Sequence, residues 1–208
     1  MDLSEDQINK YKLSFMKIAK RINKKFTLPE EMKPTVNELF KWCMRLPGEL
    51  DPQKGLWLWG DIGTGKSTMI RIINDFACLV RPEEKIGYSV HALPFCIYIR
   101  KAMTICDAYQ REGANGIYQY TVKERLCIDD LGAENPLTTY YGTPNNVIGD
   151  LLCRRYDRLD RYQTFVTTNI SPEQIAEIYG ERVYDRCGEM FNFVHFAGYS
   201  FRPAIRSI

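Results

Sequence analysis

The segment from Gly60 to Ser67 has the residue types and spacing needed to bind a phosphate group. Its pattern is a glycine, four further residues and then Gly-Lys-Ser. Glycines let the backbone turn sharply and point its N–H groups inward at an anion. Lys66 can then reach the β- and γ-phosphates of a nucleotide, and the Ser67 hydroxyl can ligate Mg²⁺. The predicted nucleotide contacts come from Gly60, Asp61, Ile62, Gly63, Thr64, Gly65, Lys66, Ser67 and Thr68.

The flanking sequence provides the context that such a loop requires. Residues 55–59 form a short apolar run that predicts a buried strand, and residues 68–77 carry apolar side chains at helical spacing. A loop placed between a strand and a helix also receives the partial positive charge of the helix N-terminus. A glycine-rich turn arising by chance would lack this context, so we predict a nucleotide-binding loop.

A second group of polar residues follows another apolar run, at 125–128. Asp129 and Asp130 come at the end of this predicted strand, and Leu131 and Gly132 follow them. Ligands of open parallel sheets bind at the carboxyl ends of the strands. There Asp129 would hold the hydration shell of Mg²⁺ opposite Ser67, and Asp130 would polarise the attacking water. Two aspartates at a strand end are also common in ordinary turns, and the phosphate loop upstream decides for the functional interpretation.

The N-terminal part predicts two helices. Ser4 with Gln7 has the pattern of a capping box, and apolar residues recur at helical spacing up to Phe26. Lysines and arginines occupy the rest of this helix, as a solvated basic face or as a docking surface for a protein or a phosphate backbone. Thr35 with Glu38 predicts a second capping box and helix. We therefore interpret residues 1–48 as a helical extension and residues 49–208 as the nucleotide-binding domain.

The remainder of the chain alternates between predicted strands and helices. Strands are predicted at 94–100, 164–169 and 193–196, the last with His195 in a core setting. Helices are predicted at 103–109, 145–159, 171–180 and from 181 onward. Residues 113–120 predict a polar loop. Its Tyr118 and Tyr120, together with Arg154, Arg155 and Arg158, could contact nucleic acid, although arginines near a helix C-terminus are also favourable without a ligand.

Composition sets limits on the class of protein. The chain has 208 residues, with 28 Lys and Arg against 26 Asp and Glu, so net charge does not point to a nucleic-acid partner. The seven cysteines include no CxxC pair, which leaves buried free thiols as the expectation for Cys78, Cys127 and Cys153. No apolar run is long enough to span a membrane. We expect a cytoplasmic protein without a membrane partner.

Four features in order carry a family resemblance: the phosphate loop, the Cys127–Gly132 segment, the strand ending Thr167-Thr168-Asn169, and the Arg182–Arg186 segment. Together they resemble the AAA+ ATPases of the DnaC/IstB group, bacterial helicase loaders and transposition helper ATPases. The match covers roughly residues 50–202, including the chain-end block Gly198–Arg202.

The resemblance implies a three-layer α/β P-loop core with a parallel sheet of about five strands and a short helical extension. It also implies binding of ATP and Mg²⁺, slow hydrolysis and self-association. By match to the family motifs, Lys66 and Asp130 act in catalysis, Asn169 takes the polar sensor position, and Arg186 looks like an arginine finger donated to a neighbouring subunit, with Arg182 as a second candidate.

This sequence departs from general AAA+ proteins in two ways. A glutamate often stands where Asp130 lies, and the shorter aspartate predicts weak hydrolysis. Only six residues follow Arg202, so we expect no C-terminal lid domain.

Several functions remain open on the sequence alone. The leading hypothesis is an ATP-switched loader that binds single-stranded DNA and a replicative helicase. Alternatives are a transposition helper that binds duplex DNA and a transposase, a P-loop small-molecule kinase, and an interaction module for which ATP is a structural ligand.

Overall fold

The structure, a computed structural model, describes residues 3–82, 95–159, 162–198 and 201. The chain divides into two compact units. The first comprises residues 1–52 and 65–96, and the second comprises residues 53–64 and 97–208. The predicted strand start at Pro94, and Tyr199, Ser200 and Arg202 of the chain-end block, lie outside the described residues.

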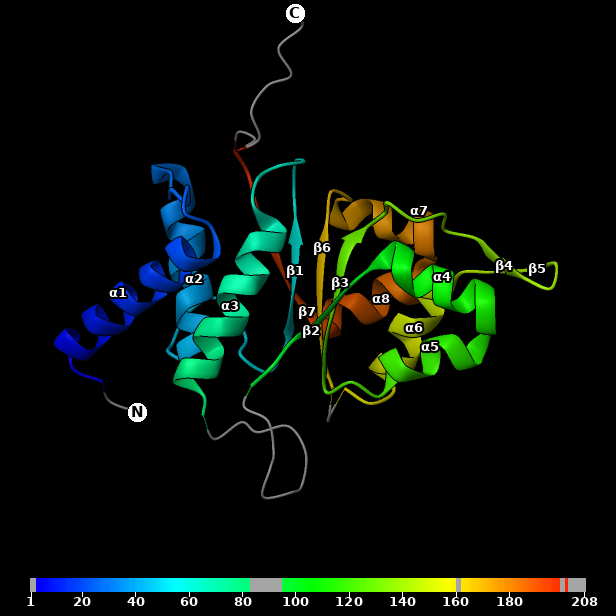
Figure 1. Cartoon of the computed structure of the whole chain (residues 1–208), viewed down its shortest axis with the longest axis horizontal. Helices are drawn as coiled ribbons and strands as arrows, with labels where there is room; N and C mark the ends of the chain where they lie inside the picture. The colour runs from blue at the N-terminus through cyan, green and yellow to red at the C-terminus, as the bar shows by residue number, and fades with distance from the viewer. Residues whose placement is uncertain (1–2, 83–94, 160–161, 199–200, 202–208) are drawn as a thin grey trace, which may run out of the picture. The chain divides into compact units, whose positions relative to one another are not determined.

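The first unit is helical, with α1 (Glu5–Ile22), a 3-10 turn at Glu30–Met32, α2 (Lys33–Met44) and α3 (Lys66–Val80) (Figure 1). The capping box at the start of α1 is confirmed, because Ser4 and Gln7 each accept the other's backbone N–H. The apolar stripe of α1 packs inside this unit, where the rings of Phe15, Phe40 and Phe76 meet with centroids 5.1–6.1 Å apart.

The second predicted capping box is wrong. Helix α2 begins at Lys33, two residues before Thr35, and no side chain caps it. Glu38 instead accepts hydrogen bonds from Lys41 Nζ at 2.6 Å and from the backbone N–H of Glu49 at 2.8 Å. The bond from Lys41 is the main reason that the pKa of Glu38 is lowered.

The second unit contains a five-stranded sheet in the order β2-β3-β6-β1-β7 (Figure 1). Every neighbouring pair in this sheet is parallel. The predicted parallel sheet is thus confirmed, and its carboxyl strand ends gather at one edge. The strands are β1 (Gly55–Trp59), β2 (Tyr98–Lys101), β3 (Arg125–Leu131), β6 (Gln163–Thr168) and β7 (Phe191–His195), and a separate antiparallel hairpin is formed by β4 (Thr138–Tyr140) and β5 (Thr143–Asn145).

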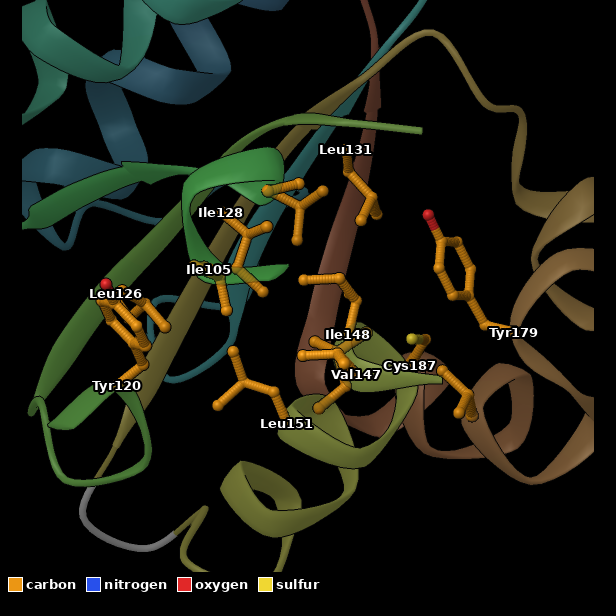
Figure 2. Close-up of a cluster of buried hydrophobic side chains, with 14 of the residues drawn as sticks. Ile105, Tyr120, Leu126, Ile128, Leu131, Val147, Ile148, Leu151, Tyr179 and Cys187 are labelled. Carbon is orange, nitrogen blue, oxygen red and sulfur yellow. The ribbon is translucent and has the colours of Figure 1, made fainter. Parts of the chain in front are cut away.

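Helices of the second unit bury one face of this sheet. Figure 2 shows Leu126 and Ile128 of β3 in one cluster with Ile105, Ile148 and Leu151. Leu126 and Ile128 point to the same face of the sheet because side chains two residues apart in a strand share a face. The helices of this unit are α4 (Ala102–Glu112), α5 (Ala114–Thr121), α6 (Val147–Tyr156), α7 (Ile175–Tyr179), which follows a 3-10 turn at Pro172–Gln174, and α8 (Glu181–Met190). Within the described residues, no helix is both long enough and apolar enough to cross a membrane.

The predicted polar loop at 113–120 is wrong, because it is helix α5. Gly113, at φ 60° and ψ −141°, interrupts the helical conformation between α4 and α5. A side chain there would also clash, since a Cβ on Gly113 would lie 2.6 Å from the Tyr140 ring. Burial of Ile117 and Tyr120 stabilises α5, whereas Tyr118 is 63% exposed.

Of the predicted buried thiols, Cys127 is fully buried, and Cys78 and Cys153 are only half-buried. Burial raises the pKa of Cys127 well above its usual value.

Arg155 is a buried residue of the second unit, so its predicted contribution to a nucleic-acid surface is wrong. Its guanidinium donates to the carbonyls of Tyr120, Lys123 and Gln163 and to the hydroxyl of Thr164. Burial lowers the pKa of Arg155 to about 10. The side chain therefore ties α6 to β6 and to the segment that follows α5.

Arg155→Met should lower the free energy of unfolding by about 3 kcal/mol or more, because buried carbonyls would lose their donor. Arg154→Met is the matched control. Arg154 is exposed and bonds to Asp150 on the same helix at 2.9 Å. Its loss should cost no more than about 0.5 kcal/mol. Urea unfolding of both variants measures the difference, and equal midpoints would contradict a structural role for Arg155.

Candidate functional site

The predicted phosphate loop has the backbone that its sequence requires. Gly60, Gly63 and Gly65 all have positive φ, at 136°, 88° and 91°. Only glycine adopts such angles readily, so these positions explain the glycine spacing. Thr64 is buried, and its hydroxyl donates to the Asp61 carbonyl at 2.9 Å, which closes the turn.

Helix α3 begins inside this loop, at Lys66, with Gly65 as its N-cap. No side chain caps the helix, and Lys66, Ser67 and Thr68 are half-buried in its first turn. Backbone N–H groups at a helix N-terminus are suited to an anion. Asp61 and Ile62 are exposed at the loop tip.

The chain after β7 holds the second unit's part of the loop. The Phe196 N–H donates to the Trp59 carbonyl at 2.7 Å, and the Phe201 N–H donates to the Gly63 carbonyl at 3.0 Å. Gly60 packs directly on this segment, since a Cβ there would lie 2.3 Å from the Phe196 carbonyl oxygen. The loop conformation is thus supported by backbone contacts from the other end of the chain.

His195 lies at the end of β7 and is exposed, so its predicted core setting is wrong. Its ring stacks on that of Trp59, with centroids 4.0 Å apart. The predicted strand is confirmed as β7, but β7 is an edge strand and the His195 side chain lies beside an aromatic ring at the surface rather than in the interior.

The aspartate pair lies at a β-bulge in β3. The pairs Ile128–Val166 and Leu131–Thr168 leave two residues of β3, Asp129 and Asp130, opposite Thr167 alone. Asp130 takes the extra place with φ 56°, a left-handed conformation that is costly for most side chains. A bulge re-aims side chains, and here it takes Asp130 out of the regular alternation of the strand.

The two carboxylates accordingly have different surroundings. Asp129 is 5% exposed, and its Oδ1 accepts a hydrogen bond from Thr167 Oγ1 at 2.6 Å. The Asp130 side chain is 52% exposed, with Lys101 Nζ 3.8 Å from its Oδ2. Thr167 Oγ1 also accepts the Asp130 N–H at 3.0 Å, so one hydroxyl positions both residues. The sequence did not predict this role of Thr167. The only indication in the sequence is that Thr167 is a polar β-branched residue near the end of a predicted strand.

Asn169 follows β6 and is exposed. Its Oδ1 lies 3.9 Å from the point that a Cβ on Gly132 would occupy. Thr168 completes the join between these strand ends by donating to the Leu131 carbonyl at 2.7 Å. The structure therefore brings Asp129, Asp130 and Asn169 together at the carboxyl edge of the sheet.

The two predicted finger arginines lie on α8 in different settings. Arg182 is exposed. The Arg186 side chain is only 14% exposed, and its Nη2 lies 3.4 Å from Asp157 Oδ1. It also donates to the Cys153 carbonyl and lies over the Tyr156 ring. Arg186 is thus held within its own chain, against the C-terminal end of α6.

Solved structures provide three comparisons with this arrangement. DnaI aligns with a TM-score of 0.58 at 18% identity, over 86% of this chain and 93% of DnaI. The DnaC helicase loader aligns with a TM-score of 0.57 at 19% identity, over 84% of this chain and 94% of DnaC. A proposed primosome component from Streptococcus pyogenes serotype M3 aligns with a TM-score of 0.54 at 21% identity, over 84% of each chain. Neither a protein-family model nor a curated protein matches the sequence.

At these identities the similarity is one of fold. The chain therefore shares the α/β fold of DnaI and of the DnaC helicase loader.

Proposed function

We propose that this chain is a Mg²⁺-dependent ATPase of DNA replication that acts as a helicase loader in the cytoplasm. The observation that carries the proposal is the pairing of a three-glycine phosphate loop with a bulged Asp-Asp strand end on a fold shared with the DnaC helicase loader. ATP would bind with its phosphates on residues 60–68. Lys66 would contact the β- and γ-phosphates.

Ser67 and Asp129 would hold Mg²⁺, which neutralises charge on the phosphates when it is bound. Thr167 supports this role, because its hydrogen bond orients Asp129. Asp130 would polarise the attacking water, and its partly exposed carboxylate leaves room for one. Asn169 would sense the γ-phosphate. A short aspartate in place of a glutamate is consistent with slow turnover.

Hydrolysis would require a second copy of the chain. Arg186 would be donated to a neighbour's ATP, with Arg182 as the alternative. Because Arg186 is tied to Asp157 and Cys153 in the single chain, it would have to leave these partners on assembly.

DNA and protein contacts would use separate surfaces. Arg154, Arg158 and Tyr118 are exposed and could contact a single strand. The exposed lysines of α1 are available to a helicase, since the apolar stripe of that helix is already packed in the first unit. A transposition helper would instead bind duplex DNA and a transposase.

Asp130→Asn should leave ATP binding intact and lower turnover by at least about tenfold, because a carboxamide is a poor base. Lys66→Ala should weaken ATP binding by about 10–100-fold, because it removes charge-assisted phosphate contacts. Titration with a fluorescent ATP analogue and a phosphate-release assay separate the two effects. Parent-like binding by Lys66→Ala, or parent-like turnover by Asp130→Asn, would refute the assigned role.

Arg186→Ala should keep ATP affinity and lose hydrolysis, since arginine fingers contribute about 10³–10⁵-fold in well-studied cases. Mixing Arg186→Ala with Lys66→Ala should restore partial activity, because one chain supplies the ATP site and the other supplies the arginine. Repeating the experiment with Arg182→Ala in place of Arg186→Ala identifies which of the two arginines acts. Co-assembled mixtures that remain inactive would exclude action in trans.

Single-stranded DNA should bind in an ATP-dependent and salt-sensitive manner. In the double variant Arg154→Ala, Arg158→Ala, affinity should depend less on salt. The slope of log K against log salt concentration should decrease in magnitude by roughly 0.7 for each phosphate contact that is lost. Lys12→Ala with Lys17→Ala, on exposed positions of α1, is the matched control and should leave this slope unchanged. Fluorescence anisotropy at several salt concentrations gives the slopes. Equal affinity for single and double strands would favour the transposition-helper function instead.

A further inference from the structure

Glu134 is a buried carboxylate to which the proposed ATPase mechanism assigns no role. It is 7% exposed, and both of its oxygens accept hydrogen bonds. Oε2 accepts the Gly132 N–H at 2.8 Å, and Oε1 accepts the Tyr179 hydroxyl at 2.6 Å. A carboxylate is costly to bury unless donors satisfy it, and such charge-assisted bonds are strong.

The first partner belongs to the turn that carries Asp130. Asp130 and Gly132 both have positive φ, at 56° and 91°. Thr167 holds the start of this turn through the Asp130 N–H, and Glu134 holds its end through the Gly132 N–H. Ile170 closes the space above Gly132, where a Cβ would lie 2.5 Å from its Cδ1. The position of the Asp130 carboxylate therefore depends on both bonds.

The second partner lies at the corner between α7 and α8. Tyr179 is the last residue of α7, and the next residue, Gly180, accepts the first hydrogen bonds of α8 from Val183 and Tyr184. The Tyr179 ring is 5% exposed and packs in the hydrophobic cluster, with its hydroxyl directed towards the Leu131 end of β3 (Figure 2). Burial and then the Glu134 carboxylate raise the pKa of Tyr179, which keeps the hydroxyl as a donor.

We propose that Glu134 and Tyr179 are a positioning pair that couples the Asp130 turn to the α7–α8 corner of the same chain. A movement of Asp130 on ATP binding or hydrolysis would change the Gly132–Glu134–Tyr179 contacts. The change would reach α8, which carries Arg182 and Arg186. The residue proposed to polarise water and the helix that carries the candidate finger arginines would then be linked inside each subunit, through groups that touch neither nucleotide nor Mg²⁺. This inference rests on the proposed ATPase function.

Tyr179→Phe tests the pair, because it removes one hydroxyl and keeps the buried ring. Tyr109→Phe is the matched control, because the partly buried Tyr109 ring packs against the same hydrophobic cluster and its ring neighbour is Tyr140. Tyr179→Phe should keep ATP affinity within about twofold and lower turnover at saturating ATP by about tenfold, whereas Tyr109→Phe should change neither quantity. A purely structural role would lower the melting temperature and leave turnover per folded molecule unchanged.

Backbone hydrogen exchange provides a second measurement that does not need hydrolysis. In Tyr179→Phe, amide exchange should accelerate at residues 130–134 and at residues 181–186 together. Adding ATP should no longer change exchange in the second segment. Glu134→Gln should have the same effects, because a carboxamide cannot accept both bonds, and it replaces Tyr179→Phe if that variant fails to fold.

The outcomes distinguish this inference from the proposed function. A parent protein that neither binds nor hydrolyses ATP would refute the ATPase, and exchange in the nucleotide-free chain would still decide on the coupling. Parent-like turnover in Tyr179→Phe from an active parent, or unchanged exchange in both segments, would overturn the positioning pair.

Discussion

The β-bulge at the end of β3 is the constraint on which the candidate site depends. It places two aspartates opposite Thr167 and gives Asp130 a left-handed backbone. A regular strand would pair Asp129 with Thr167 and Asp130 with Thr168, so the Asp130 N–H would not reach the Thr167 hydroxyl in the observed way. The hydroxyl of Thr167 satisfies the extra N–H of the bulge and orients Asp129, so a single side chain makes the irregular strand end possible.

Buried polar groups at the two ends of the sheet have different functions in the fold. Near the amino end of β6, Arg155 satisfies carbonyls from three segments and closes the structure. Near the carboxyl end, Thr167, Thr168 and Glu134 hold turns that carry the candidate site. The apolar layer between them packs α4, α6 and α8 on the strands and fixes how far apart the two ends lie.

The similarity to DnaI and DnaC at under a fifth identity is consistent with this division. An α/β fold tolerates wide substitution in its apolar layer, provided that volume and pattern are kept. Function depends on a few residues placed on that frame, which is why the proposed roles require tests on this chain. The same reasoning applies to α8, where Arg182 is exposed and Arg186 is held against α6.

Neighbouring residues were enough to predict the glycine turn, the strand before it and the strand that ends in two aspartates, whereas the parallel sheet was predicted from the family resemblance. Backbone angles and side-chain periodicity are local properties, so they can be read from a short window. Long-range packing sets the burial of Arg155 and Glu134, the helix at 114–121, the exposure of His195 and the role of Thr167. Each of these depends on a partner 9 or more residues away or on burial against another segment, as the 37-residue separation of Asp130 and Thr167 illustrates. Contacts of that kind are set by packing, which no local pattern encodes.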